Sequence, residues 1–238
     1  SHSNILPNLA CQLSQGLEMD LDQMPDEIAH YGCASGLFAM EKAVEYCRQS
    51  NRAAIVFTFD QCFWIANPVY DRTHENFKAS LRAAVLFSDG AVGTLIVPES
   101  MKDRFESPLM EVTSIKTDFV PGNTITMNGN SFLVKNGVDK EMPTVVSDKL
   151  VKPMLEDAAI TTDEIDEWSI HQGGLPVLNT FTEDHTLGLT QEQISRSRLL
   201  FQRYGNFSAP SCMFVLESFF REKELSKIGN KGMVVGFG

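Results

Sequence analysis

The sequence predicts an α/β fold, in which helices alternate with short buried strands. Residues 52–59 (Arg-Ala-Ala-Ile-Val-Phe-Thr-Phe) and 91–97 form nearly continuous apolar runs, which are typical of strands covered on both faces. Residues 34–48 carry apolar side chains every three or four positions, which indicates a helix. We therefore expect a sheet with helices on both of its faces.

Apolar periodicity and turn signals place the other elements. Asp89 and Gly90 mark the turn into the second strand, and residues 161–164 (Thr-Thr-Asp-Glu) have the pattern of a helix cap. Glycine and asparagine are frequent in residues 121–136, which indicates a loop. Further helices are expected over 5–17, 76–86, 149–158, 175–185, 191–204 and 209–224, and further strands over 26–31, 108–119, 167–170 and 233–237.

The composition excludes several classes of protein. The 238 residues carry a formal net charge of −11, which argues against a general nucleic-acid binder because such proteins need a basic face. The longest apolar runs are far too short to span a bilayer, and the first residues lack the pattern of a signal peptide. We therefore expect a cytoplasmic protein with no membrane span.

The sequence predicts no bound metal and no redox cofactor. The five cysteines include no Cys-x-x-Cys pair, and no two histidines have the spacing of metal ligands. The chain also has no glycine motif for phosphate or nicotinamide binding. Free thiols in a reducing compartment are the simpler interpretation of the cysteines.

A candidate nucleophile lies in the segment Tyr-Gly-Cys-Ala-Ser-Gly at 31–36. Cys33 is placed where an extended segment passes into a helix, and the unpaired N–H groups and helix dipole there favour an anion. We therefore expect a lowered pKa for the Cys33 thiol. Gly36 falls in the first helical turn, where close packing explains it better than flexibility. The alternative for Cys33 is a buried, inert cysteine.

Two further turns carry polar side chains. His171 ends a short predicted strand, where open sheets place their ligands, and Asn206 lies beside a glycine between two predicted helices. Each has a structural alternative: His171 as a hydrogen-bonded core residue, and Asn206 as a left-handed turn residue followed by a helix cap at Ser208. Together, a Cys, a His and an Asn form a set suited to nucleophilic catalysis.

Two chemistries use such a set. Papain-like amide hydrolysis has the same chain order of Cys, His and Asn, but Gly-Cys-Ala-Ser-Gly at 32–36 lacks the local signature of those proteases. The chain also lacks the features of a secreted, disulfide-bonded protease. Thioester chemistry is therefore favoured.

The local sequences around the three residues are specific. Gly-Cys-Ala-Ser-Gly surrounds Cys33, and Tyr-Gly-Asn-Phe-Ser surrounds Asn206. Further motifs are Leu-Phe-Ser-Asp-Gly-Ala at 86–91, Met-Asn-Gly at 127–129, Ile-Asp-Glu-Trp-Ser-Ile-His-Gln at 165–172, His-Gln-Gly-Gly at 171–174 and Gly-Phe-Gly at 236–238. Over essentially the whole chain, they resemble condensing enzymes of the thiolase superfamily, between 3-oxoacyl-[acyl-carrier-protein] synthase III and chalcone-synthase-like type III polyketide synthases.

The resemblance implies a thiolase-like fold with the layers α-β-α-β-α. Residues 1–100 would form the end of the N-terminal half, with Cys33, and residues 101–238 the C-terminal half, with His171 and Asn206. Members of this superfamily have many more residues before the nucleophile and continue beyond the glycine loop. We therefore expect the fold to be incomplete here at the N-terminus and at the C-terminal glycine loop. The resemblance also implies a homodimer.

The implied activity is that of an acyltransferase that catalyses decarboxylative Claisen condensation, in fatty-acid, polyketide or related secondary-metabolite synthesis. Cys33 would accept the acyl group from an acyl thioester. The backbone N–H groups of Cys33 and Gly238 would form the oxyanion hole. His171 and Asn206 would donate hydrogen bonds to the thioester carbonyl of a malonyl-type extender.

The implied substrates are CoA or acyl-carrier-protein thioesters, so CoA or phosphopantetheine is a carrier and not a bound cofactor. Phe87 and Trp64 would line the substrate tunnel. Leu-Pro-Val at 175–177 stands where synthase III enzymes carry an arginine that helps to dock the carrier protein. Two other functions stay open: acyl transfer to an amine or hydroxyl without condensation, and a non-catalytic or truncated subunit of a condensing-enzyme complex.

Overall fold

A computed structural model describes residues 7–62, 70–105, 110–122, 124–128, 131–221 and 230–238. The helices are α1 (Leu9–Gly16), α2 (Ser35–Ser50), α4 (Phe77–Leu86), α5 (Val138–Val146), α6 (Lys152–Asp157), α7 (Leu175–Thr180), α8 (Ser195–Tyr204) and α9 (Pro210–Arg221). The strands are β1 (Ala54–Asp60), β2 (Gly90–Ile96), β3 (Ile125–Asn128), β4 (Ser131–Val134), β5 (Glu167–Ile170) and β6 (Gly232–Val235). Short helical turns are η1 (Gly32–Ala34), η2 (Glu99–Arg104), η3 (Ser147–Val151) and η4 (Thr162–Glu164).

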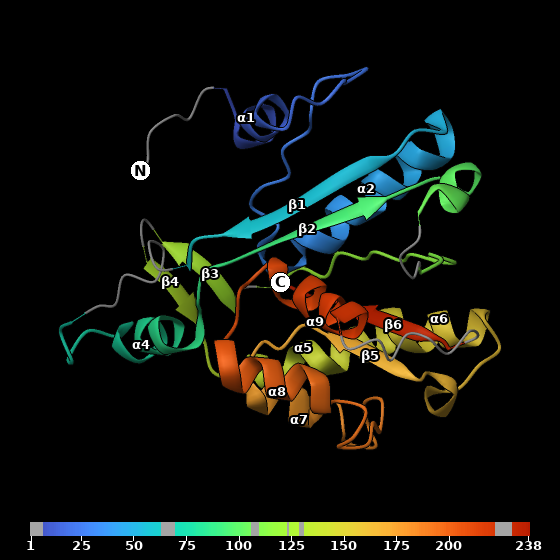
Figure 1. Ribbon diagram of the computed structural model, residues 1–238. Helices are drawn as coiled ribbons and strands as arrows, with labels where there is room; N and C mark the ends of the chain where they lie inside the picture. The colour runs from blue at the N-terminus through green and yellow to red at the C-terminus, as the bar shows by residue number, and fades with distance from the viewer. Residues whose placement is uncertain (1–6, 63–69, 106–109, 123, 129–130, 222–229) are drawn as a thin grey trace.

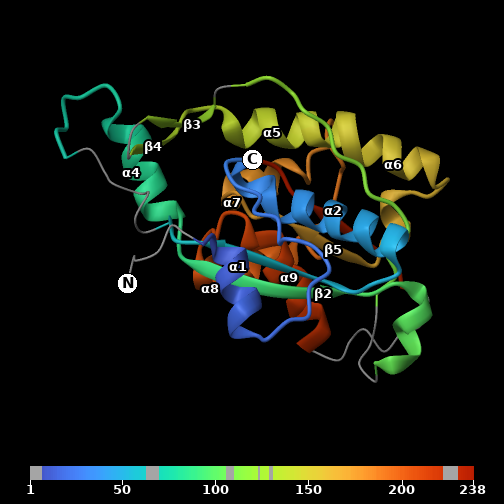
Figure 2. The same cartoon turned by 90° about the horizontal axis from the view of Figure 1, so that it is seen from above.

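Two small sheets enclose a layer of helices (Figures 1 and 2). β1 pairs antiparallel with β2, and β5 pairs parallel with β6. Helix α9 contacts strands of both sheets, while α2 packs on β1, β2 and α9. Helix α8 packs on β5, and α7 packs on α5 and α8. The predicted alternation of helices and strands is confirmed, and no helix in the described part of the chain has the length and apolarity to cross a membrane.

The larger core lies on one face of the β5–β6 sheet. Ser169 points to the opposite face, where its hydroxyl donates a hydrogen bond to the carbonyl of Cys212 in α9 at 2.6 Å. Because side chains alternate along a strand, Trp168 and Ile170 face the other way. Both are at most 1% exposed and belong to a cluster with Val177 and other apolar residues of α5, α6, α7 and β6. Strand β5 has the predicted bounds.

The β1–β2 sheet buries only one face in the described part of the chain. Phe57 pairs with Gly93 in the ladder, and Val56 and Thr58 are buried on the side of α2 and α9. Phe57 and Phe59 on the other side are 45% and 47% exposed. The expectation that both faces of these strands are covered is therefore wrong for the described residues.

The segment between β2 and α5 differs most from the predicted elements. Residues 110–119 form no strand, whereas β3 and β4 form an antiparallel hairpin inside the predicted loop. The guanidinium of Arg82 in α4 fixes this hairpin, because Nε and Nη2 donate to the carbonyl of Val134 at 3.0 and 2.8 Å. Helical structure begins at Val138, well before the expected start at residue 149, and continues through η3 into α6.

Candidate active site

Cys33 lies in η1, directly before α2, and is 3% exposed. Two glycines bring this turn close to other elements. A Cβ added to Gly36 would lie 2.8 Å from both the Ala209 carbonyl oxygen and the Thr58 Cγ2. Only glycine therefore lets the first turn of α2 approach β1 and the start of α9 so closely. The prediction that Gly36 serves close packing is confirmed.

Gly238 lies against the backbone of Cys33. A Cβ added to Gly238 would lie 2.3 Å from the Cys33 nitrogen and 2.8 Å from the Ala34 nitrogen. Any side chain at residue 238 would thus collide with the amide groups at the start of the nucleophile helix. The structure therefore brings together the two residues from which the sequence predicts an oxyanion hole.

His171 follows β5 and is 2% exposed. Its N–H donates to the Val235 carbonyl at 2.7 Å, which extends the β5–β6 pairing to the site. The imidazole and the Phe237 ring form a T-shaped contact, with ring centroids 4.9 Å apart and planes at 79°. Burial lowers the pKa of His171 to about 3, so the ring is neutral at pH 7. Its Nδ1 has no hydrogen-bond partner among the described residues.

Asn206 is fixed by a short piece of backbone pairing. Its N–H donates to the Leu86 carbonyl at 3.0 Å, and its carbonyl accepts from the Ser88 N–H at 2.8 Å. This pairing gives the motif at 86–91 a structural role, because its backbone attaches the end of α4 to the turn that carries Asn206. Gly90 completes the fit, since an added Cβ would lie 2.6–2.9 Å from the Phe207 side chain.

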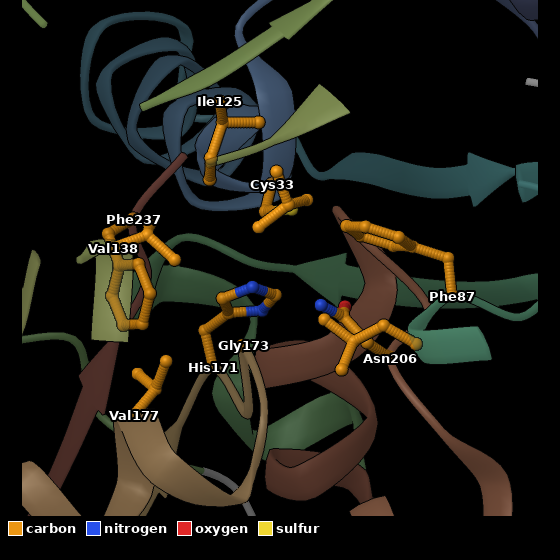
Figure 3. Close-up of a pocket in the computed structure, with 11 residues that line it drawn as sticks. Cys33, Phe87, Ile125, Val138, His171, Gly173, Val177, Asn206 and Phe237 are labelled. Atoms are coloured by element: carbon orange, nitrogen blue, oxygen red, sulfur yellow. The ribbon is translucent and has the colours of Figure 1, made fainter. Parts of the chain in front are cut away.

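The side-chain amide of Asn206 has a defined orientation. Its Oδ1 accepts hydrogen bonds from the Ser208 N–H at 2.8 Å and the Ser211 hydroxyl at 3.0 Å. The NH2 group is therefore directed away from these partners, and Figure 3 shows it beside the imidazole of His171. Asn206 is 1% exposed, so this donor faces a protein interior and not bulk water.

One cavity joins the three candidate catalytic residues (Figure 3). Its volume of about 20 Å³ has room for about one or two water molecules. Phe87, which is predicted to line the substrate tunnel, is part of the wall of this cavity, whereas Trp64 lies outside the described residues. The complete lining is Cys33, Leu86, Phe87, Ile125, Val134, Val138, His171, Gly173, Val177, Asn206 and Phe237.

The electrostatics of Cys33 differ from the prediction. Burial, together with the carboxylate of Asp60, raises the pKa of the Cys33 thiol to about 12. A hydrogen bond with the Ser208 hydroxyl, 3.3 Å from Sγ, lowers it by less than burial raises it. The expected lowering of the pKa by the helix start is therefore wrong, because loss of hydration outweighs it. At pH 7 the thiol is protonated and the neighbouring imidazole is neutral.

Sequence reasoning missed two residues at this site. Ser208 is predicted only as a helix cap, yet its side chain contacts Cys33. Asp60 ends β1, where its Oδ2 accepts from the Ala209 N–H at 2.9 Å. Both contacts join residues far apart in the chain, and the proximity of Ser208 to Asn206 is the only local signal for either.

Comparisons of the sequence with known proteins identify its family. Residues 111–238 match the family of chalcone and stilbene synthases, C-terminal domain. Type III polyketide synthase B of Arabidopsis thaliana is 25% identical, over 98% of this chain and 61% of that protein. A putative chalcone synthase of Bacillus subtilis is 24% identical, over 87% of this chain and 57% of that protein. The chain thus spans about three fifths of the length of these relatives.

Solved structures confirm the expected thiolase-like fold. The 1,3,6,8-tetrahydroxynaphthalene synthase of Streptomyces coelicolor, a bacterial type III polyketide synthase, has a TM-score of 0.81 at 19% identity. That match covers 99% of this chain and 65% of the other. Xanthomonas campestris OleA, solved with lauric acid and lauroyl-CoA, has a TM-score of 0.75 at 16% identity and covers 100% and 70%. Because the family match spans more than half of the sequence, the chain belongs to the chalcone and stilbene synthase family, within the thiolase superfamily.

Proposed function

We propose that this protein is an acyltransferase that joins an acyl thioester to a malonyl-type thioester by decarboxylative Claisen condensation. The observation that carries the proposal is that Cys33, His171 and Asn206 all line one cavity. A thiol, a neutral imidazole and an amide donor are the groups that acyl capture and enolate stabilisation require. Family membership supports the same chemistry, in polyketide, fatty-acid or related synthesis.

The first stage is acylation of Cys33. The neutral imidazole of His171 accepts the thiol proton, and the thiolate attacks the carbonyl carbon of the acyl thioester. The carrier thiol then leaves as its bond to the acyl group breaks, and it takes up a proton. The N–H groups of Cys33 and Gly238 stabilise the oxyanion formed in between. The close approach of Gly238 to the Cys33 amide supports the assignment of these two N–H groups to the oxyanion hole.

The second stage is decarboxylation of the extender. Asn206 donates from its NH2 group, and His171 donates from Nε2 in the tautomer that carries hydrogen there. Both bonds go to the thioester carbonyl of the extender, where they stabilise the enolate formed as CO2 leaves. The enolate carbon attacks the acyl group on Cys33, and the Cys33 thiolate departs. Loss of CO2 supplies the carbanion, so the site needs no strong base for an α-proton.

The substrate class we propose is the CoA thioester. The structural relative OleA, solved with lauroyl-CoA, supports this choice. The Leu-Pro-Val sequence at 175–177 favours CoA over a carrier protein, because it replaces the docking arginine of synthase III enzymes. The cavity of about 20 Å³ is smaller than an acyl chain. We further propose the homodimer that the family implies, which native mass measurement tests.

Release of CO2 from malonyl-CoA, with and without an acyl-CoA, tests the proposal. We expect CO2 release together with a product that contains a new carbon–carbon bond. Acyl transfer without condensation would instead modify Cys33 and consume no malonyl-CoA. A protein that neither takes up an acyl group nor decarboxylates malonyl-CoA would contradict the proposed function and favour a non-catalytic subunit.

A further inference from the structure

Ser208 makes the one described side-chain hydrogen bond to the sulfur of Cys33. Its Oγ lies 3.3 Å from Sγ, within the range of a hydrogen bond to sulfur. Ser208 belongs to the turn between α8 and α9, so the contact joins distant parts of the chain. A serine hydroxyl can accept a hydrogen bond from a thiol and, after rotating, donate one to a thiolate.

The backbone holds Ser208 in a conformation that is costly for it. Its φ of 62° lies in the left-handed region, which residues with a Cβ avoid. Three hydrogen bonds maintain this conformation: Ser208 N–H donates to Asn206 Oδ1 at 2.8 Å, Ser211 N–H donates to the Ser208 carbonyl at 3.0 Å, and Ala209 N–H donates to Asp60 Oδ2 at 2.9 Å. Strain of this kind persists where surrounding contacts determine the geometry.

We propose that Ser208 is a further residue of the acylation step, whose hydroxyl donates a hydrogen bond to the Cys33 thiolate, and that Asn206 positions it. This inference rests on the proposed function, since it concerns the same nucleophile. The atoms balance without another reactant: the thiol proton moves to the His171 imidazole, and the Ser208 hydroxyl keeps its own hydrogen. Asn206 thereby serves both stages, with Oδ1 holding Ser208 and the NH2 group facing the extender.

The charges around Cys33 make this donor important. Asp60 opposes the thiolate, because its carboxylate raises the pKa of Cys33. The thiols of Cys62 and Cys212 are neutral neighbours, since burial raises the pKa of each. His171 is neutral until it accepts the thiol proton, because burial lowers its pKa. Ser208 is the side chain in the described part of this site whose contact lowers the pKa of Cys33.

Two variants separate the hydroxyl from the backbone conformation. Ser208→Ala and Ser208→Gly both remove the hydroxyl, but glycine adopts a φ of 62° without strain. The full chain of each variant is alkylated with iodoacetamide at several pH values between 7 and 9. Peptide mass spectrometry follows the rate at Cys33 alone. Thermal unfolding of both variants is the control for correct folding.

We expect both variants to lower the Cys33 alkylation rate about tenfold at every pH, equivalent to a shift of about one unit toward alkaline pH. Unchanged rates in Ser208→Gly would overturn the proposal, whether or not Ser208→Ala is slow, because the conformation and not the hydroxyl would then matter. Iodoacetamide needs no thioester, so the result is independent of the proposed condensation. If wild-type Cys33 takes up no acyl group but the variants show the shift, the proposed function fails and the Ser208 contact stands.

Discussion

The backbone of Phe87 pairs in parallel with that of Asn206, in a bridge outside the regular sheets. This bridge joins the end of α4 to the end of α8 and places the two side chains on the wall of one cavity. The position of the amide therefore depends on packing around residues 86–91 as well as on its own turn. Gly90 packs directly against the Phe207 side chain in this region.

Gly90→Ala should destabilise the protein by about 1–3 kcal/mol, because the new methyl group meets the Phe207 ring base at 2.6–2.9 Å. Chemical denaturation measures the change in free energy of unfolding. Gly122→Ala is the matched control, since nothing lies within 4 Å of a Cβ added there. Equal stability of the two variants would show that the Gly90–Phe207 contact does not constrain the fold.

Asn206→Ala should slow decarboxylation of malonyl-CoA about 100-fold or more, since an oxyanion donor is lost. The rate of CO2 release measures this. Ser211→Ala is a milder variant for comparison. It removes one of the two hydrogen bonds to Oδ1 of Asn206, and the bond from the Ser208 N–H remains. A smaller loss is expected there. Full decarboxylation by Asn206→Ala would contradict the assigned role of the amide.

The neutral state of His171 should appear in the pH dependence of stability. Its pKa is about 3 in the folded protein, against about 6.5 when unfolded, so the unfolded chain binds the extra proton between these values. The contribution of neutral His171 to the free energy of unfolding is fully present above pH 6.5. Between pH 6.5 and 3 it falls by about 1.4 kcal/mol per pH unit.

The test of this prediction compares wild type with His171→Gln by chemical denaturation at several pH values. The variant lacks the titrating group, so its stability should fall less steeply between pH 6.5 and 3 than that of wild type. His185→Gln is the control, because the His185 side chain is more than half exposed. Parallel curves for wild type and His171→Gln would mean that His171 is not buried in the neutral form.

Asp60→Asn should make Cys33 react faster. The carboxylate raises the pKa of the thiol, and asparagine removes the charge while its oxygen still accepts from the Ala209 N–H. Alkylation of Cys33 by iodoacetamide at pH 8 should become severalfold faster. Asp118→Asn, at an exposed residue, serves as the control. A slower or unchanged rate in Asp60→Asn would show that this charge does not act on the nucleophile.

The sequence predicted the parts of the site that local patterns determine. β5 is a short apolar run followed by His171, and the turn around Asn206 has glycine beside it, so local sequence places both. The β3–β4 hairpin was missed because its strands have only four residues each, in a segment rich in glycine and asparagine. Such short strands depend on packing against α4 more than on their own sequence.

The chemistry of Cys33 could not be predicted from local sequence. The start of α2 is visible in the sequence, but the burial of the thiol and its distance from Asp60 arise from tertiary packing. The Ser208 contact has the same origin. Helix dipoles act on exposed groups by modest amounts, whereas complete burial shifts a pKa by several units. Burial of the Cys33 thiol therefore outweighs the helix dipole, and its pKa is raised and not lowered.

The most direct test of the central claim is the intact mass of the protein after incubation with a panel of acyl-CoA thioesters. The account predicts one added acyl group in wild type and in Cys47→Ala, a matched variant that removes another buried thiol, near the end of α2. No addition is expected in Cys33→Ala. A folded wild-type protein that gains no acyl group from any donor, or a Cys33→Ala variant that still gains one, would contradict the account.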